Sequence, residues 1–461
     1  MRGGRISERP LIPLLTGRGL AVLGALLVIP TLGLIADSPA QTIYHTVFLG
    51  ISVITLSLIV DWFTARRMVN NLRLTATLPR RVFATTPAIM SIAYKVRRCF
   101  YPVHCTIRPV RPVNVDSNVD QQTVIIAPNS RSGTIDYNIT PLRKGEFSWP
   151  GATIRLSTGL RLFQFQCGIP FAAPGILPVY PNPVLRQSDR LSIFRGLHTG
   201  MTPNDLAGGE GKEFDRLRPY SHGDELRSVD WKRSARRAGS GLASSLVVRV
   251  YRPETHQRVA IALDCSRRMG NLIDRRLQFD YACDAVSALA NLAISNQDEV
   301  GLMAFSHRLE RVVPARRGYR QLDLLSQALM PLEPASLEPD YDLLRSHGLS
   351  QRRRSLFVVI TSVTGQDALA RIGTALLPLA HKHLPLVVTI SDRSLAAMVE
   401  QPAETVDDAY VVAAAVEQTE SIERALQTMG RHGIEYLQAD VQDLSSAINR
   451  RYWELKIRGK L

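Results

Sequence analysis

The chain has 461 residues, which is too long for one ordinary soluble domain and favours two or three folded units. Hydrophobic residues make up 45% and charged residues 21%, a balance that excludes a disordered chain and one embedded in a membrane throughout. The formal net charge is +15, from 56 basic against 41 acidic residues. Such an excess is compatible with nucleic acid, anionic lipid or an acidic protein as partner, and charge alone does not choose among them.

Two uncharged runs stand near the N-terminus, at residues 19–36 and 43–60, and each is about long enough to cross a bilayer. Arginines precede the first run and follow the second, whereas the loop between the runs has no Lys or Arg. By the positive-inside rule, both termini and the soluble domains are expected in the cytoplasm. We therefore expect a multi-pass anchor in the inner (cytoplasmic) membrane over residues 1–68, with two transmembrane helices. A cleaved signal peptide and a buried helical hairpin are the alternatives.

Residues 69–195 consist of short β-rich runs separated by turn residues, which predicts a small antiparallel sandwich or barrel. Residues 196–250 follow as a glycine-rich linker and a charged segment, defined here as residues 213–239. From 251 to 461, uninterrupted Val/Ile/Leu runs alternate with amphipathic helical runs, a pattern typical of a doubly wound, mostly parallel sheet. The expected fold class is therefore α/β, with a membrane anchor and a β-rich domain before the parallel sheet.

The cysteines are five in number and form no CxxC pair, so a disulfide framework is not expected. Two of them lie in apolar patterns, and all are interpreted as small core residues in a reducing compartment. No GxGxxG or GxxxxGK[ST] motif follows a predicted strand, which argues against dinucleotide or nucleoside triphosphate binding.

The stretch ALDCSRRMG ends the apolar run RVAIALD, and places Asp264 and Ser266 where a parallel strand meets its loop. An Asp-x-Ser-x-Ser loop at this place resembles the metal-ion-dependent adhesion site of von Willebrand factor type A domains, in which hydroxyls and acids hold Mg²⁺. Here the third position is Arg268, and the strand LFVVITS ends in Thr361 and Ser362 instead of Asp. We therefore expect a degenerate site in which Arg267 or Arg268 pairs with Asp264 in place of the ion. No cofactor is expected, and Mg²⁺ at Asp264 and Ser266 is the alternative.

The charged segment, EFDRLRPYSHGDELRSVDWKRSARRAG, has two functional interpretations and one structural interpretation. It is an arginine-rich contact for a partner or nucleic acid, or it holds a catalytic His222/Asp224 pair, or it is an ion-paired strap between two domains. One histidine near acids is weak evidence for acid–base chemistry, so we favour the strap, which can double as a docking surface. Its second half predicts a short helix with Asp224 near the start.

The block FDRLRPYSHGDELRSVDWKRSARR, together with the N-terminal spans, the β-rich region and VAIALDCSRRM, resembles the bacterial DUF58 family. The most specific matches lie between Arg218 and Arg237: Tyr220, Gly223, Asp224, Arg227, Asp230, Trp231, Lys232, Ala235 and Arg236. The chain departs from the family where an Asp-Pro-Phe-Gly run is usual, since residues 157–160 are STGL. A second departure is Ser362, at a position where many members keep an Asp.

The resemblance implies a von Willebrand factor type A-like domain that binds proteins, and a family without an established enzymatic activity. It implies a MoxR-type AAA+ ATPase as partner, with a transglutaminase-like membrane protein as another, and a chaperone or assembly role. Membrane lipid is a further expected partner. The residues expected to bind the protein partner are Asp264, Ser266, Arg268, Arg218, Tyr220, Asp224, Arg227, Asp230, Trp231, Lys232 and Arg236.

We therefore predict a membrane-anchored, cytoplasm-facing interaction scaffold that is not an enzyme. Two alternatives come from other classes. One is a hydrolase acting on the cell envelope through His222, Asp224 and Asp264. The other is a membrane-tethered nucleic-acid binder, which is less expected because the basic residues near the spans already suit anionic headgroups.

Overall fold

The computed structural model describes most of the chain, and its internal contacts divide it into two compact units, Met1–Pro181 and Asn182–Leu461. Each unit is described by itself. The described residues are 11–35, 40–97, 102–118, 121–128, 131–157, 161–184, 213–221, 226–238, 246–252, 257–363, 365–391, 398–399 and 405–461.

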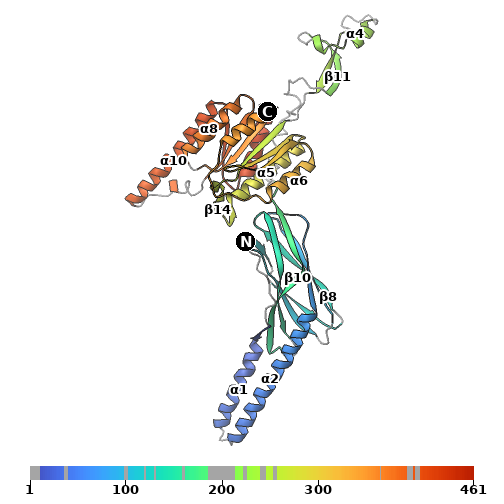
Figure 1. The fold of residues 1–461 in the computed structure, drawn as a ribbon, viewed down its shortest axis with the longest axis vertical. Helices are drawn as coiled ribbons and strands as arrows, with labels where there is room; N and C mark the ends of the chain where they lie inside the picture. The colour runs from blue at the N-terminus through green and yellow to red at the C-terminus, as the bar shows by residue number, and fades with distance from the viewer. Residues whose placement is uncertain are drawn as a thin grey trace. The chain divides into compact units, whose positions relative to one another are not determined.

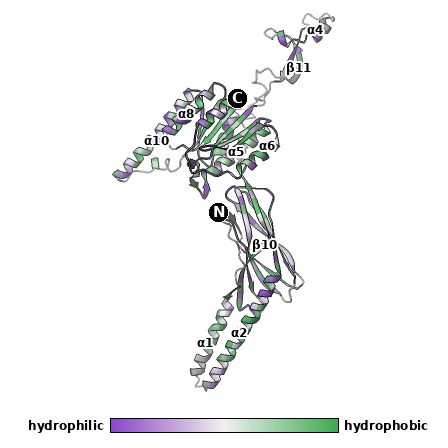
Figure 2. Ribbon diagram, in the orientation of Figure 1, coloured by the Kyte–Doolittle hydropathy of each residue, from purple (hydrophilic) through white to green (hydrophobic). Residues whose placement is uncertain are grey.

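The N-terminal unit begins with a short strand, β1 (Ile12–Leu15), and two helices, α1 (Gly17–Ile35) and α2 (Ala40–Asn71), which lie side by side (Figure 1). Within the described residues, one helix is long and apolar enough to cross a membrane, Tyr44–Asn71, and its 18-residue apolar window is only 6% buried. Hydrophobic residues dominate this helix away from the sandwich (Figure 2). The chain therefore has a candidate membrane helix.

The expectation of two spans is corrected to one among the described residues. Within the described residues, Gly17–Val28 of α1 forms a shorter apolar stretch. The helix also starts directly at the sandwich, since the amide of Thr16 donates to the Leu162 carbonyl (3.1 Å).

Two antiparallel sheets follow, and they pack over one core. One sheet has the order β1-β10-β9-β5-β7, with the two-residue strand β3 paired in parallel to the end of β10, and the second has the order β2-β4-β8-β6. The strands are β2 (Leu72–Thr77), β3 (Val82–Phe83), β4 (Ala88–Val96), β5 (Val103–Pro109), β6 (Val115–Ser117), β7 (Gln122–Ile126), β8 (Ser132–Pro141), β9 (Gly145–Ser157) and β10 (Phe163–Tyr180). This sandwich occupies the region in which alternating short strands are expected.

The core of the sandwich continues into α2. Ala65 and Met68, in the last turns of the helix, are buried in the same cluster as Leu74 of β2 and Trp149 of β9. The Tyr137 hydroxyl donates to the Ile107 carbonyl (2.6 Å) and thereby joins the two sheets. The helix and the sandwich therefore form one packed body within this unit.

The charged segment forms a β-ribbon with a helix packed on it. β11 (Glu213–Pro219) pairs antiparallel with β12 (Val247–Arg252), and a 3₁₀ turn at Leu226–Ser228 leads to α4 (Trp231–Ala238). The ribbon and α4 are joined by the Val247 amide, which donates to the Ser234 hydroxyl (3.0 Å).

The C-terminal sheet has the strand order β17-β16-β13-β18-β19-β20, parallel except for β17. It starts at its centre with β13 and grows first to one side and then to the other, which is a doubly wound order. The strands are β13 (Arg258–Asp264), β16 (Glu299–Phe305), β17 (Leu309–Arg316), β18 (Leu356–Thr361), β19 (Leu384–Ile390) and β20 (Glu435–Ala439). Every residue of β18 is buried, as expected for a parallel strand covered on both faces.

Helices cover both faces of this sheet (Figure 1). One buried cluster joins Val259, Ile261 and Leu263 to three helices: α5 (Gln278–Ser295), α6 (Tyr319–Leu329) and α11 (Leu444–Ile457). The alternate residues Ala260 and Ala262 belong to a second cluster with α7 (Asp342–Ser350), α8 (Gln366–Ala380) and α10 (Val406–Arg431). The period of two along β13 therefore assigns each side chain to one face.

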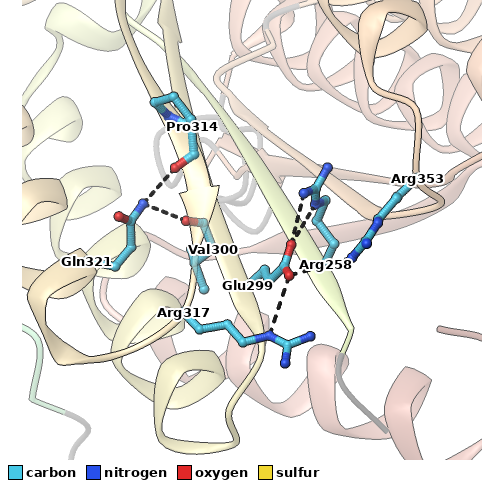
Figure 3. A network of polar contacts seen from close by, with 7 residues as sticks. All are labelled: Arg258, Glu299, Val300, Pro314, Arg317, Gln321 and Arg353. Atoms are coloured by element: carbon cyan, nitrogen blue, oxygen red, sulfur yellow. Dashed lines mark hydrogen bonds and ion pairs between the residues drawn. The ribbon is translucent and has the colours of Figure 1, made fainter. Parts of the chain in front are cut away.

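An arginine-rich network joins the starts of the strands (Figure 3). Glu299 accepts two hydrogen bonds from Arg258 (3.0 and 2.9 Å) and lies 3.4 Å from Arg317 and 3.8 Å from Arg353. Nearby, the Gln321 amide donates to the Val300 and Pro314 carbonyls (2.8 and 2.9 Å), which fastens α6 to β16 and β17. This edge of the sheet is therefore held by polar contacts and is the opposite edge from Asp264.

Four cysteines lie in the described residues, and all four are buried free thiols: Cys105, Cys167, Cys265 and Cys283. Burial raises the pKa of Cys105 to about 12 and that of Cys167 to about 11. The prediction of inert core thiols is confirmed for these four, and Cys99 lies outside the described residues.

Candidate functional site at the centre of the C-terminal sheet

Asp264 is the last residue of β13, at the point where the strand order reverses. Leu263 pairs with Ile360 of β18, so Asp264 and Thr361 come next on the two neighbouring strands. Both strands also pair in parallel, which brings their ends to the same edge of the sheet. In doubly wound sheets this edge at the reversal point is the usual place for a ligand.

The Asp264 carboxylate is fully buried and both of its oxygens accept hydrogen bonds. Oδ1 accepts from the Ser266 amide (2.7 Å), and Oδ2 accepts from the Thr361 hydroxyl (2.6 Å). Burial raises the pKa of Asp264, and the Thr361 and Ser266 hydrogen bonds oppose that rise. The carboxylate is thus held by its neighbours and is closed to solvent.

Other polar atoms around Asp264 are buried without a partner. The Ser266 hydroxyl, the Gln278 carbonyl oxygen and the Tyr341 hydroxyl have no hydrogen bond with a described residue. Gln278 instead uses its amide nitrogen to donate to the Ser362 hydroxyl (3.1 Å). Burial, and then the negative charge of Asp264, raise the pKa of Tyr341 to about 12.

The two arginines of the loop bind Glu338 and not Asp264. The Arg267 Nε lies 2.6 Å from Glu338 Oε1, and the Arg268 Nε lies 2.6 Å from Oε2. The hydrogen bond from Arg268 is the main reason why the pKa of Glu338 is lowered. The expected pairing of Asp264 with either arginine is therefore wrong, because a surface carboxylate from the loop before α7 takes both guanidinium groups.

A dication would find a poor set of ligands in this arrangement. The buried acid, Asp264, already accepts from Thr361 and Ser266, and the second acid, Glu338, is shared by two guanidinium groups. Within the residues that the structure describes, no three His, Cys, Asp or Glu side chains gather as metal ligands. The unpaired buried oxygens of Ser266, Gln278 and Tyr341 are neutral, so they do not supply the further carboxylates that a dication favours.

In the charged segment, Asp230 caps helix α4. Its Oδ1 accepts from the Arg233 amide (3.1 Å), and its Oδ2 accepts from the Arg249 side chain (3.0 Å) on β12. These contacts lower the pKa of Asp230, the Arg249 hydrogen bond most of all. The helix therefore begins at Trp231, and the expectation that it starts near Asp224 is corrected, because Asp230 supplies the N-cap oxygen.

Around α4 the described side chains present an aromatic and cationic surface. Trp231 is 61% exposed and Leu226 is 62% exposed. Arg227, Lys232 and Arg236 are exposed beside them in sequence. We call these five residues the Trp231 surface. An exposed tryptophan among cations is the kind of residue that carries binding energy in protein interfaces.

The sequence-predicted site residues thus fall into two groups. Asp264, Ser266 and Arg268 lie at the end of β13, whereas Arg218, Tyr220, Asp230 and the Trp231 surface belong to the ribbon and α4. Arg218 in β11 and Tyr220 just after this strand are half-buried, and the Tyr220 amide donates to the Leu246 carbonyl (3.0 Å). His222 and Asp224 lie outside the described residues.

Three residues at the site were missed from the sequence: Thr361, Glu338 and Tyr341. Thr361 had a signal, since the last residues of neighbouring parallel strands lie side by side. No sequence signal pointed to Glu338 or Tyr341, because the loop that carries them reaches the site only through tertiary contacts. Two backbone hydrogen bonds set the position of this loop. The Arg267 amide donates to the Leu337 carbonyl (3.1 Å), and the Ala335 amide donates to the Cys265 carbonyl (2.6 Å).

Fold and site together define a mixed α/β protein with a candidate membrane helix, a β-sandwich and a doubly wound sheet whose central carboxylate is closed. Residues 216–429 match the family described as "Protein of unknown function DUF58". This match covers the charged segment and the sheet from β13 through most of α10.

Curated relatives with similar sequences are the uncharacterized proteins Mb1516 of Mycobacterium bovis and MT1527 of Mycobacterium tuberculosis. Each is 26% identical over 206 residues, which cover 43% of this chain. The chain spans about 60% of the length of these relatives.

Two solved structures are similar over 43% of this chain and 98% of theirs. One is the conserved hypothetical protein BatB from Bacteroides thetaiotaomicron, with 17% identity and a TM-score of 0.31. The other is an uncharacterized membrane spanning protein from Vibrio fischeri, with 12% identity and a TM-score of 0.16.

Proposed function

We propose that the chain is a membrane-anchored, cytoplasm-facing interaction scaffold and not an enzyme. In this proposal its C-terminal unit, a von Willebrand factor type A-like domain, binds a protein partner. The family resemblance suggests a MoxR-type AAA+ ATPase, with a chaperone or assembly role for the pair. A transglutaminase-like membrane protein is a further candidate partner on the same ground.

The observation that carries this proposal is the closed state of Asp264, together with the two guanidinium groups of its loop that bind Glu338 instead. Both oxygens of the carboxylate are engaged, so it is poorly placed to attack a substrate or to take its proton. Arg267 is 66% exposed and shares Glu338 with Arg268. The loop can therefore present positive charge to an acidic partner directly, where related sites use a metal ion.

The Trp231 surface supports a second contact with the same partner. Three cations stand next to Trp231 and Leu226 in the sequence, and the helix that carries Trp231 is fixed to the ribbon by Asp230 and Ser234. A rigid aromatic residue amid positive charge suits an acidic, partly apolar protein surface.

Copurification of the full-length chain with the MoxR-type ATPase of the same organism tests the proposal. Arg267→Ser and Arg268→Ser should each weaken binding by about tenfold, and Trp231→Ala by at least as much. Arg431→Ser is the control for the arginines, since Arg431 is exposed at the end of α10, just before β20 begins at the opposite edge of the sheet. Tyr410→Ala, which removes a 73% exposed aromatic residue from α10, is the control for Trp231.

Unchanged binding in the three test variants, or equal losses in the controls, would contradict the proposal. Titration with Mg²⁺ adds an independent test of the metal alternative. The donor set leads us to expect no saturable rise of the melting temperature, whereas a functional ion site would stabilise the folded chain as it filled.

A further inference from the structure

A groove lies in the N-terminal unit where α2 enters the sandwich, and its volume is about 780 Å³. Leu11, Trp62, Val69 and Ile169 supply apolar wall, and Arg66 and Arg73 supply charge. The other wall comes from β10 between Cys167 and Ala172, where the pairing with β9 shifts register between Pro170 and Gly175. A register shift of this kind bends a strand, and here it accompanies a hollow between β10 and the helix.

The charge in this groove is of one sign. No Asp or Glu stands among its lining residues, and neither Arg66 nor Arg73 has an ion pair with a described residue. The Arg66 guanidinium instead lies 5.0 Å from the centre of the Trp62 ring, and both arginines are exposed. Two unpaired guanidinium groups at one hollow are suited to a phosphate, which each can bind with two parallel hydrogen bonds.

The groove also lies at a defined distance from the apolar span. The uncharged run of α2 ends at Val60, and Arg66 follows six residues later, about 9 Å along the helix at ~1.5 Å per residue. Trp62 between them is the residue type that sits at the interface of a bilayer. If α2 crosses the membrane, the groove therefore opens at the depth of the headgroups, and Trp62 is nearer the acyl chains than Arg66 is.

We propose that this groove binds the headgroup of one anionic phospholipid. Arg66 and Arg73 hold the phosphate, Trp62 positions the Arg66 guanidinium and faces the first methylene groups, and Leu11, Val69 and Ile169 line the hollow that receives the headgroup. This site goes beyond a general attraction between basic residues and a charged surface, because it is saturable and depends on the shape of the groove. It is also independent of the protein partner proposed for the C-terminal unit.

The test is native mass spectrometry of the full-length chain, released from detergent and titrated with phosphatidylglycerol or phosphatidylcholine. The wild type should retain one phosphatidylglycerol molecule in preference to phosphatidylcholine. Arg66→Gln and Arg73→Gln should each weaken phosphatidylglycerol binding by about tenfold, as expected for the loss of a charge-assisted contact. Arg80→Gln is the control, because Arg80 is exposed beyond the far end of β2 and does not line the groove.

A second pair of variants tests whether the position of an added negative charge matters, or only the net charge of the protein. Ala172→Glu adds a carboxylate at the exposed rim of the groove, whereas Ala173→Glu adds the same charge at the next residue, which is exposed but does not line it. Only Ala172→Glu should weaken phosphatidylglycerol binding. Neither substitution touches the buried core, so loss of folding does not confuse the comparison.

Three outcomes would overturn the proposal. They are equal retention of the two lipids by the wild type, unchanged binding in the arginine variants, and equal losses in the two Glu variants. Glycerol 3-phosphate should not displace the lipid at equal concentration, because it lacks the apolar part. Complete displacement would assign the groove to a soluble phosphate and contradict the assignment to lipid.

Discussion

Asp264 is the residue on which the interpretation of the C-terminal unit depends. Its carboxylate accepts from the Ser266 amide and the Thr361 hydroxyl, and both donors would lose their partner in Asp264→Ala. Burial of unpaired polar groups costs about 1–3 kcal/mol each, so Asp264→Ala should lower the free energy of unfolding by at least ~2 kcal/mol. Asp264→Asn keeps the shape and can reorient its amide, and should cost less than about 1 kcal/mol. Thermal denaturation of the full-length chain, with hydrogen exchange in β13 as the local readout, would compare the two.

The charge of Asp264 also predicts a dependence on pH. Burial raises its pKa in the folded state, so the folded chain binds more protons than the unfolded chain between the ordinary Asp pKa and the raised value. Stability contributed by this residue is therefore greatest at low pH and falls as the pH rises through that window. Because Glu338 is present in both proteins, the difference between wild type and Asp264→Asn isolates this effect. The fall should be absent from the melting temperatures of Asp264→Asn as the pH rises above the ordinary Asp pKa of about 4. A variant that tracks the wild type would contradict the raised pKa.

At the scale of elements, helix α4 depends on its cap. Asp230→Ala removes the oxygen that binds the Arg233 amide and the partner of Arg249, and should destabilise the helix by about 1–2 kcal/mol. Asp230→Asn is the matched control, since Asn caps a helix about as well as Asp but cannot form the ion pair. Hydrogen exchange in residues 231–238 should quicken strongly in the first variant and slightly in the second. Equal exchange in both would mean that the ion pair and not the cap holds the helix.

Helix α11 is fixed to the sheet by a buried ion pair. Lys456 lies 2.7 Å from Asp298, which also accepts from the Tyr452 hydroxyl and from the Gln257 amide. Lys456→Met leaves a buried charge without its cation and should lower stability by about 3–5 kcal/mol. The double variant Lys456→Met/Asp298→Asn should recover part of this loss, as measured by denaturant unfolding. A double variant that is less stable than the single one would contradict the attribution of the loss to the unpaired charge of Asp298.

At the scale of the whole molecule, the two compact units have separate cores. The core of the N-terminal unit is built from residues 65–179, and the two clusters of the C-terminal sheet are built from residues 259–455. We therefore expect substitutions in one core to leave the melting of the other unchanged. Leu376→Ala removes buried side-chain volume between α8 and the sheet. It should lower the free energy of unfolding of the C-terminal unit by about 2–5 kcal/mol. Hydrogen exchange at the amides of Met90 and Trp149, in the N-terminal core, should stay as in the wild type. Faster exchange there would contradict the prediction that the two cores melt independently.

Much of the fold could be predicted from patterns of hydrophobicity. The buried run VAIALD and its counterparts predicted a parallel sheet, and the alternating runs before residue 190 predicted the sandwich. The prediction that the cysteines are core residues is confirmed for four of them. The second span was predicted from an uncharged run alone. Among the described residues one helix qualifies as a span, and α1 starts against the sandwich, through contacts that a window of hydropathy does not contain.

The sequence by itself determined that Asp264 stands at a strand end, that the site lacks the usual oxygens and that cations surround it. Only the tertiary structure decided which groups bind one another. Arg267 and Arg268 are next to Ser266 in the chain, yet they bind Glu338, about seventy residues away, while Thr361 from a neighbouring strand binds Asp264. The physical reason is burial. A carboxylate inside the sheet takes the short donors that fit beside it, and long guanidinium side chains reach the solvated carboxylate at the surface.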